Sequence, residues 1–428
     1  MPSAIVVGAG VGGLAVAGAL ARRDWSVTLL ERDDRLDADR AGLMLWPSGV
    51  AALRRLGLAG GLDAIASPVA GRGVRRPDGG WLVRPDEVDG GAAPVVVRRV
   101  DLHDALVAGL GSRVDVRTGV TVSGVGISGS SVPAVSDGTS TWQADLVVGA
   151  DGVHSAVRRR LAPEAIVISA GCTAWRAFIP WYRATALMES LERLPAGAHG
   201  GETVGGGHRF RYALLQHRGS SGASAQGGIY WTATVPGAAR PESADAQLAL
   251  LRRWFADWHA PIGALIGATG PDDVIQHTVG ELWPLPRSFA FPAATRSDAA
   301  RRHGSAPMRS DAAKRRDSAG RGGYALIGDA AHAMSHHLGT GACLALEDAA
   351  TLVEQVAGDL ATGGDLQTAL DRYAHGRRRD LVRIGRQSRR VGAALATTKP
   401  ARERDAALGL VPGPLGRASQ AFRSLRRS

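Results

Sequence analysis

The chain has 428 residues, about two to four times the usual length of one domain, so we expect more than one hydrophobic core. Hydrophobic residues make up 45% of it and charged residues 21%, which excludes disorder, collagen and coiled coil as descriptions of the whole chain. No apolar run reaches the roughly 20 residues that a membrane span requires. The first residues already read as a strand rather than a secretory signal. We therefore expect a cytoplasmic protein with no stable membrane insertion.

The net charge of +11 is distributed unevenly along the chain. Residues 296–321 carry a net +5 and residues 376–428 a net +11, so the remainder carries −5. Nearly all of the basic residues are arginine in a chain rich in Ala and Gly, which a GC-rich coding sequence explains without phosphate recognition. A solvated basic loop and tail on a mildly acidic body predict no nucleic-acid partner.

The first elements form a complete βαβ pattern. A short strand at residues 4–7 leads into Gly8-Ala9-Gly10-Val11-Gly12-Gly13, an Ala/Leu-rich helix and a second strand that ends at Glu31. Three of these glycines serve a sharp turn, a close backbone approach to a pyrophosphate and tight helix–strand packing. The helix N-terminus favours phosphate, and the Glu31 carboxylate suits ribose hydroxyls rather than a 2′-phosphate. This unit predicts a dinucleotide site and leaves FAD and NAD both open.

Further elements follow in chain order. Pro77-Asp78-Gly79-Gly80 between two short strands predicts a hairpin, and a buried strand runs into Asp151-Gly152. Residues 172–285 read as a mostly antiparallel sheet with a helix at 245–258. Residues 288–323 lose periodicity, and a strand at 324–327 then ends at Gly328-Asp329. Two helical patterns, at 342–356 and 371–391, complete the chain.

The turn after residue 327 favours a flavin over NAD. An aspartate at position 329 suits the hydroxyls of a ribityl chain, and Leu338-Gly339-Thr340-Gly341 opens another helix. The backbone N–H groups of such a helix end can face the electron-rich edge of an isoalloxazine ring, which NAD does not have.

At this point the sequence resembles the class A flavin-dependent monooxygenases, the p-hydroxybenzoate-hydroxylase-like group. The resemblance is carried by the glycine motif with Glu31, by Asp151-Gly152, and by Gly328-Asp329-Ala330-Ala331-His332 leading to Leu346-Glu347-Asp348-Ala349. It implies an α/β fold, with a Rossmann-like FAD-binding domain and an inserted α+β substrate domain on a mostly antiparallel sheet. The implied division is 1–71, 99–170 and 324–395 for the FAD-binding domain, 72–98 for a hairpin of the substrate domain and 171–285 for its body, 286–323 for a basic mobile insertion, and 396–428 for a basic C-terminal tail.

The resemblance also implies roles for individual residues. FAD would be bound by Gly8, Gly10, Val11, Gly12, Gly13, Glu31, Arg32, Arg40, Arg99, Val122, Asp151, Gly152, Asp329, Leu338, Gly339, Gly341 and Ala342. NADH or NADPH would be the co-substrate, and the family has no second Rossmann unit that would bind it.

Two groups of side chains are open to more than one interpretation. His336 and His337 are candidates for catalytic proton donors, or they have only a structural role. The sequence predicts no metal site around them. Phe210, Tyr212 and Trp231 are candidate substrate contacts or ordinary core. Alternation sets Phe210 opposite to Arg209 on one strand and leaves open which face meets the flavin.

The predicted function is an FAD-dependent monooxygenase of aromatic catabolism or secondary metabolism. It would use NAD(P)H and O2 to hydroxylate or epoxidise an aromatic or olefinic molecule through a flavin C4a-hydroperoxide. We expect a largely apolar, aromatic or polycyclic substrate. A carboxylate-rich substrate would instead need paired arginines, for which Arg176, Arg209 and Arg211 are the candidates. The alternatives are a flavin-dependent halogenase, a double-bond reductase of the same superfamily, and a flavoprotein kept for binding alone.

Overall fold

The computed structural model describes most of the chain. The described residues are 1–39, 41–69, 73–84, 92–127, 132–192, 200–215, 227–237, 242–293, 322–361 and 363–396. Arg40, most of the expected basic insertion and nearly all of the expected C-terminal tail lie outside these residues.

The first domain is built on a six-stranded sheet, in which the neighbouring strands pair in parallel except at β18. Its order is β18 (Ala290–Pro292), β19 (Gly323–Leu326), β12 (Leu146–Gly149), β1 (Ser3–Val7), β2 (Ser26–Leu30) and β8 (Val114–Arg117). The central strands are runs of buried aliphatic residues, as a parallel sheet covered by other elements requires. The first βαβ unit is therefore present as its sequence pattern predicts.

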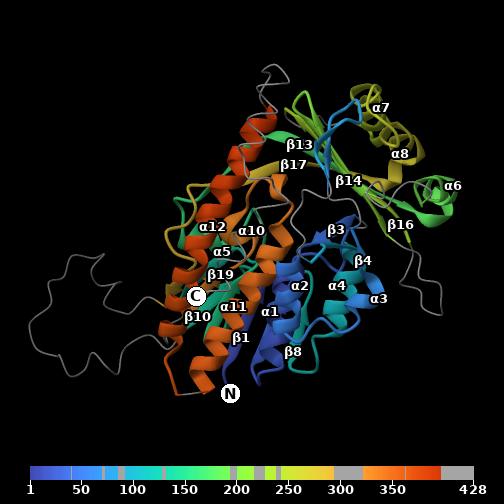
Figure 1. Cartoon of the computed structure of the whole chain (residues 1–428). Coiled ribbons are helices and arrows are strands. Elements are labelled where there is room, and N and C mark those ends of the chain that lie inside the picture. Colours follow the sequence, from blue (N-terminus) through green and yellow to red (C-terminus); the bar gives the residue numbers. More distant parts are fainter. Residues whose placement is uncertain are drawn as a thin grey trace, which may run out of the picture.

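Helices pack around this sheet. The first helix, α1 (Val11–Ala21), is buried along its whole length between α4 (Arg99–Ala108) and α11 (Gly341–Ala361). The smaller elements of this domain are α2 (Pro47–Arg55), α3 (Leu62–Ile65), α5 (Ala156–Leu161), α10 (Asp329–His332), the 3-10 helix η4 (His336–Leu338) and the three-stranded sheet β11 (Thr141–Gln143), β10 (Pro133–Ser136) and β9 (Gly124–Ile127). The helix at one edge, α12 (Leu366–Ala396), is long enough to pass both domains (Figure 1).

The second domain is a seven-stranded, mostly antiparallel sheet. Its order is β17 (Val274–Trp283), β13 (Ile166–Pro180), β16 (Gly228–Pro236), β15 (His208–Leu215), β14 (Gly200–Gly205), β5 (Val74–Arg75) and β6 (Trp81–Val83). Three helices, α6 (Trp181–Glu192), α7 (Ala244–Trp254) and α8 (Ile262–Ala268), and the 3-10 turn η3 (Pro271–Asp273) complete it. These helices lie on the outer side of the sheet, so its other face is turned toward the first domain (Figure 1).

Three expected domain boundaries differ from those of the structure. A small sheet of β3 (Gly42–Leu45), β7 (Val95–Arg98) and β4 (Ser67–Pro68) holds residues 95–98, which were expected in the hairpin of the substrate domain. Strand β13 begins at Ile166, before the expected boundary at 171. The segment 286–323 is not an insertion from its start, because β18 pairs with β19 in the first sheet.

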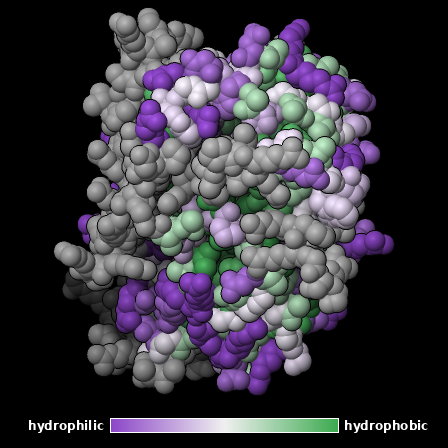
Figure 2. Space-filling model, turned by 45° about the vertical axis from the view of Figure 1, so that its right-hand side comes forward, coloured by the Kyte–Doolittle hydropathy of each residue, from purple (hydrophilic) through white to green (hydrophobic). Residues whose placement is uncertain are grey.

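Apolar residues gather in the middle of one face, above a lower part that is mainly polar (Figure 2). Within the described residues, none of the helices combines the length and the apolarity that crossing a bilayer requires.

Candidate active site between the two sheets

The glycine turn after β1 has the geometry of a nucleotide-binding loop. Gly8 has a φ of +102°, and a Cβ there would lie 2.5 Å from the carbonyl oxygen of Ala150. A Cβ on Gly13 would lie 1.9 Å from the carbonyl oxygen of Gly8. A Cβ on Gly10, in contrast, would meet nothing within 4 Å. Gly8 and Gly13 are thus needed for packing, whereas Gly10 faces open space that a ligand can approach.

Glu31 lies at the adenosine end of this turn. Its Oε2 accepts a hydrogen bond from the backbone N–H of Ala9 at 2.6 Å, and its Oε1 accepts one from Asp33 at 3.1 Å. The carboxylate therefore holds the glycine turn and keeps acceptor capacity for a ribose hydroxyl. Arg32 beside it is exposed and approaches Asp33, and Val122 is buried. None of these three predicted residues lines the flavin-sized cavity described below.

Asp151 has a local structural task. Its Oδ2 accepts hydrogen bonds from the backbone N–H groups of Ala156 and Val157 at the start of α5, at 2.7 and 3.2 Å. Its buried Oδ1 has no hydrogen-bond partner in the described structure. The following residue, Gly152, has a φ of +73° and lines the cavity.

A buried ionic cluster fixes the loop that carries Asp329. Asp348 accepts hydrogen bonds from the backbone N–H of Gly328 at 2.9 Å and from Arg377 Nε at 2.6 Å, and its Oδ2 lies 2.5 Å from His332 Nε2. Burial raises the pKa of the Asp348 carboxyl, but His332 and Arg377 lower it by more, so the pKa lies below its ordinary value. Asp329 is left exposed at the cavity, with its carboxylate available to a ligand.

One cavity of about 320 Å³ joins the glycine turn, this loop and the inner face of the second sheet, and it is the one that we call the flavin-sized cavity. Of the predicted site residues, it is lined by Gly10, Val11, Gly12, Gly13, Arg99, Gly152, Asp329, His336, Gly339, Gly341 and Ala342. Arg99 also donates a hydrogen bond to Asp39 at 2.8 Å. The side chain of Leu338 packs against Val74, Val204 and Val391 rather than lining this cavity. The second weak catalytic candidate, His337, lines a separate cavity.

The predicted substrate contacts Phe210, Tyr212 and Trp231 point the other way. They belong to the core between the sheet and its outer helices, where Phe210 and Trp231 stack with ring centroids 5.3 Å apart. Trp231 Nε1 donates a hydrogen bond to the hydroxyl of Thr269 at 2.9 Å. The prediction is wrong because the apolar face of the sheet is needed to pack against the helices.

The face toward the cavity is polar. Arg209 and Arg211 lie on it, and both bind Glu202 of β14: Arg209 Nε is 2.5 Å from Oε1, and Arg211 Nη2 is 2.5 Å from Oε2. Burial raises the pKa of Glu202, but the two arginines outweigh it and bring the pKa to about 2. One carboxylate between two guanidinium groups leaves a net positive charge at this wall.

Arg176 adds a second positive charge. In the part of the chain that the structure describes, no carboxylate pairs with it. The imidazole of His336 lies nearby, with its Nε2 2.6 Å from the hydroxyl of Thr234, and its buried Nδ1 has no partner in the described structure. Burial, with nearby charges including Arg176, holds the pKa of His336 well below its usual range and that of His277 at about 4, so both are neutral at pH 7.

Sequence reasoning missed Glu202, Thr234 and His277, and it considered Arg176 only as a contact for an anionic substrate. Strand alternation places Thr234 on the face opposite to Trp231, so the pattern held part of the signal.

The residues present fit a flavin dinucleotide. Open space beside Gly10, an exposed carboxylate at Asp329 and glycines at both helix starts surround a cavity with a net positive inner wall. These groups suit a pyrophosphate, a polyol and an electron-rich ring edge, respectively.

Comparisons with known proteins agree with this geometry. The model of the FAD binding domain family matches residues 2–178. The chain is 30% identical to "Aurachin C monooxygenase/isomerase" of Stigmatella aurantiaca over 379 residues, which cover 86% of this chain and 83% of that protein. It is also 30% identical to a 3-amino-4-hydroxybenzoate 2-monooxygenase of Streptomyces platensis, over 91% of this chain and 88% of the relative.

A solved structure has the same fold. The crystal structure of Klebsiella pneumoniae HpxO complexed with FAD and uric acid matches with a TM-score of 0.72 and 22% identity, over 98% of this chain and 95% of that one. The Rossmann-like domain with an attached antiparallel substrate domain, predicted from the sequence, is confirmed.

Proposed function

The chain belongs to the FAD-dependent class A aromatic monooxygenases, and we propose that it uses NADH or NADPH and O2 to hydroxylate or epoxidise a small aromatic or olefinic substrate. The observation that carries the proposal is the cavity in which the glycine turn, the Asp329 loop and the polar face of the second sheet meet. No side chain has to act as a nucleophile in this reaction.

We infer which residues hold the cofactor. The N-terminus of α1 at Gly10–Gly13 would bind the pyrophosphate, and Glu31 would accept hydrogen bonds from the adenosine ribose. Asp329 would bind the ribityl hydroxyls, and the backbone at Gly339–Ala342 would lie along the ring. When bound, FAD supplies the chemistry that accepts a hydride from NAD(P)H and activates dioxygen. The protein supplies position, exclusion of water and a positive wall.

The polar face alters the expected substrate. Arg176 and the hydroxyls of Thr232 and Thr234 face the cavity, so a ring with a carbonyl, hydroxyl or carboxylate oxygen fits better than a purely apolar one. The uric acid of the Klebsiella complex and the hydroxybenzoate of the Streptomyces relative are rings of this kind. An aromatic substrate remains the proposal, with at least one oxygen substituent directed toward Arg176.

His336 is placed to accept a hydrogen bond from a hydroxyl group of such a substrate. When its Nε2–H donates to Thr234, the lone pair of Nδ1 is free to accept that hydrogen bond, and the lowered pKa keeps the ring neutral. Thr234 would hold the ring in this tautomer.

The test is anaerobic reduction of the purified FAD-containing protein by NADH and by NADPH. A panel of phenols, hydroxybenzoates, quinolones and uric acid is then tried for stimulation. Under 18O2, a stimulating compound should yield a product that carries one labelled oxygen atom. A product reduced without O2 would instead identify a double-bond reductase, and a product that forms only with halide a halogenase. A protein that binds FAD while no compound stimulates NAD(P)H oxidation would favour the binding-only alternative.

A further inference from the structure

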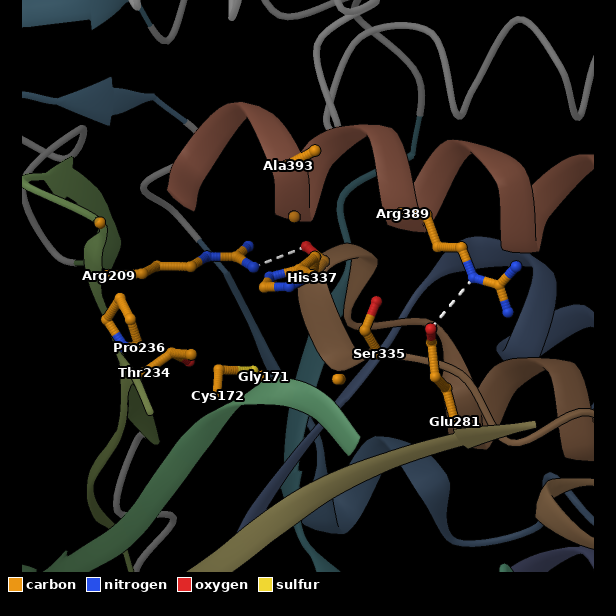
Figure 3. A pocket seen from close by; sticks show the side chains of 13 residues that line it. Gly171, Cys172, Arg209, Thr234, Pro236, Glu281, Ser335, His337, Arg389 and Ala393 are labelled. Atoms are coloured by element: carbon orange, nitrogen blue, oxygen red, sulfur yellow. Dashed lines mark hydrogen bonds and ion pairs between the residues drawn. The ribbon is translucent and has the colours of Figure 1, made fainter. Parts of the chain in front are cut away.

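A second cavity lies behind the flavin-sized one. We call it the rear pocket; it has a volume of about 260 Å³ and lies between the bulge of β13, the ends of β15 and β16, and α12 (Figure 3). Arg209 reaches into it from one side, the ion pair of Glu281 and Arg389 closes the other, and α12 crosses above with Ala393 (Figure 3).

The local backbone makes this space. The register of β13 shifts between Ser169 and Thr173, where Gly171 has a φ of +72° and no atom would lie within 4 Å of a Cβ. On α12, a Cβ at Gly392 would lie 2.7 Å from His337 Nε2, so only glycine lets this helix approach the histidine so closely. The rear pocket is therefore a feature of the strand and helix geometry.

Two of its polar side chains, Arg209 and His337, have spare hydrogen-bonding capacity, and for Arg209 the spare group is a donor. Arg209 is 4% exposed; it donates to the carbonyl oxygen of His337 at 2.6 Å and pairs with Glu202, yet its Nη2 has no partner among the described residues. The Nδ1 of His337 has none either, in the same part of the chain. A buried donor without an acceptor is costly, and a ligand that supplies oxygen acceptors would remove that cost.

The charges around the rear pocket favour an anion. Glu202 pairs with both Arg209 and Arg211, so its single negative charge balances only one of these two positive charges. Glu281 balances Arg389, from which it lies 3.1 Å away, so one positive charge remains uncompensated. Burial raises the pKa of the Cys172 thiol to about 11, and burial with Arg209 lowers that of His337 to about 4. Both are neutral at pH 7 and do not change this balance.

We propose that the rear pocket binds the carboxylate or phosphate group of a small molecule, with Arg209 as its principal contact. The volume lies below the range of pockets that enclose a drug-sized ligand, which favours a small acid or one end of a larger molecule. Arg209, Thr234 and Ser335 line both cavities, so an occupant lies one side chain away from the flavin-sized cavity. The site does not depend on the proposed reaction, because binding is measured without turnover.

The test is calorimetric titration of the oxidised, FAD-containing protein with benzoate and with inorganic phosphate. The background is Arg176→Gln, which removes the unpaired arginine of the flavin-sized cavity. Ala393 is exposed on α12 and lines the rear pocket, so Ala393→Glu and Ala393→Gln form a matched pair that differs in charge. At least one anion should bind with 1:1 stoichiometry. Ala393→Glu should weaken it about tenfold or more relative to Ala393→Gln, because a like charge is brought next to the anion.

A further titration with NADP+ identifies the source of the anionic group. Competition with the bound anion, lost in Ala393→Glu, assigns the rear pocket to a phosphate of the nicotinamide dinucleotide, and no competition assigns it to a free small acid. Failure of both anions to bind, or equal binding by the Glu and Gln variants, would overturn the proposal. Either failure leaves the monooxygenase assignment intact, since that assignment is read from oxygen incorporation.

Discussion

Glu202→Gln should destabilise the protein strongly, because one carboxylate holds two buried guanidinium groups. Its side chain is 5% exposed, and its pKa of about 2 lies about 2.5 units below the ordinary 4.5. At 1.36 kcal/mol per unit, that difference corresponds to about 3 kcal/mol of stability at neutral pH. Removing one partner from a buried ion pair costs about 3–5 kcal/mol, which agrees in size.

The assay is urea unfolding of the wild-type and Glu202→Gln proteins at pH 6 and pH 8. Because the folded pKa is lowered, the contribution of Glu202 is complete above its ordinary pKa and is lost only as the pH falls toward 2, so both pH values should give the same loss. The matched control is Glu354→Gln, which breaks the half-exposed pair with Arg55 and should cost below about 1 kcal/mol. Equal losses for Glu202→Gln and the control would refute the buried-triad reasoning.

Three further predictions concern the cofactor, the histidines and the sheet face. Glu31→Ala should weaken FAD retention by about 1.5–3 kcal/mol, since a charge-assisted contact is lost; an unchanged Kd in a fluorescence titration would exclude that role. Burial and nearby arginines hold the pKa values of His277 and His337 at about 4, so stability is complete above about 6.5 and is lost as the pH falls toward 4. From pH 7 to pH 5 the protonation of each histidine should lower the free energy of unfolding, measured in urea, by about 2 kcal/mol. His337→Gln should flatten this pH profile, and a profile parallel to that of the wild type would contradict the prediction. Phe210→Leu should lower the melting temperature and leave the KM for a stimulating substrate unchanged, whereas Arg176→Gln should raise that KM; the reverse pattern would restore the aromatic face as the substrate surface.

The first domain could be predicted because its pattern depends on residues that are near one another in the sequence. The glycine turn, its helix and Glu31 follow from contacts between residues near in sequence, and the structure shows the same βαβ unit. The boundaries at 95–98 and 290–292 failed because those strands pair with distant partners, β3 and β19, that a local pattern does not identify. The same holds for Glu202, whose partners lie across a strand pair.

The orientation of β15 shows what the sequence contained beyond the local pattern. Alternation separated Arg209 from Phe210 without deciding which face meets the flavin. The deciding partner is the predicted helix at 245–258, because its buried Leu248 and Leu251 need an apolar surface to pack on. Only the aromatic face of β15 supplies one, so the arginine face is left for the cavity. An amphipathic helix that follows a sheet in the chain thus predicts the outer face of that sheet, and by exclusion the polar face from which the substrate contacts come.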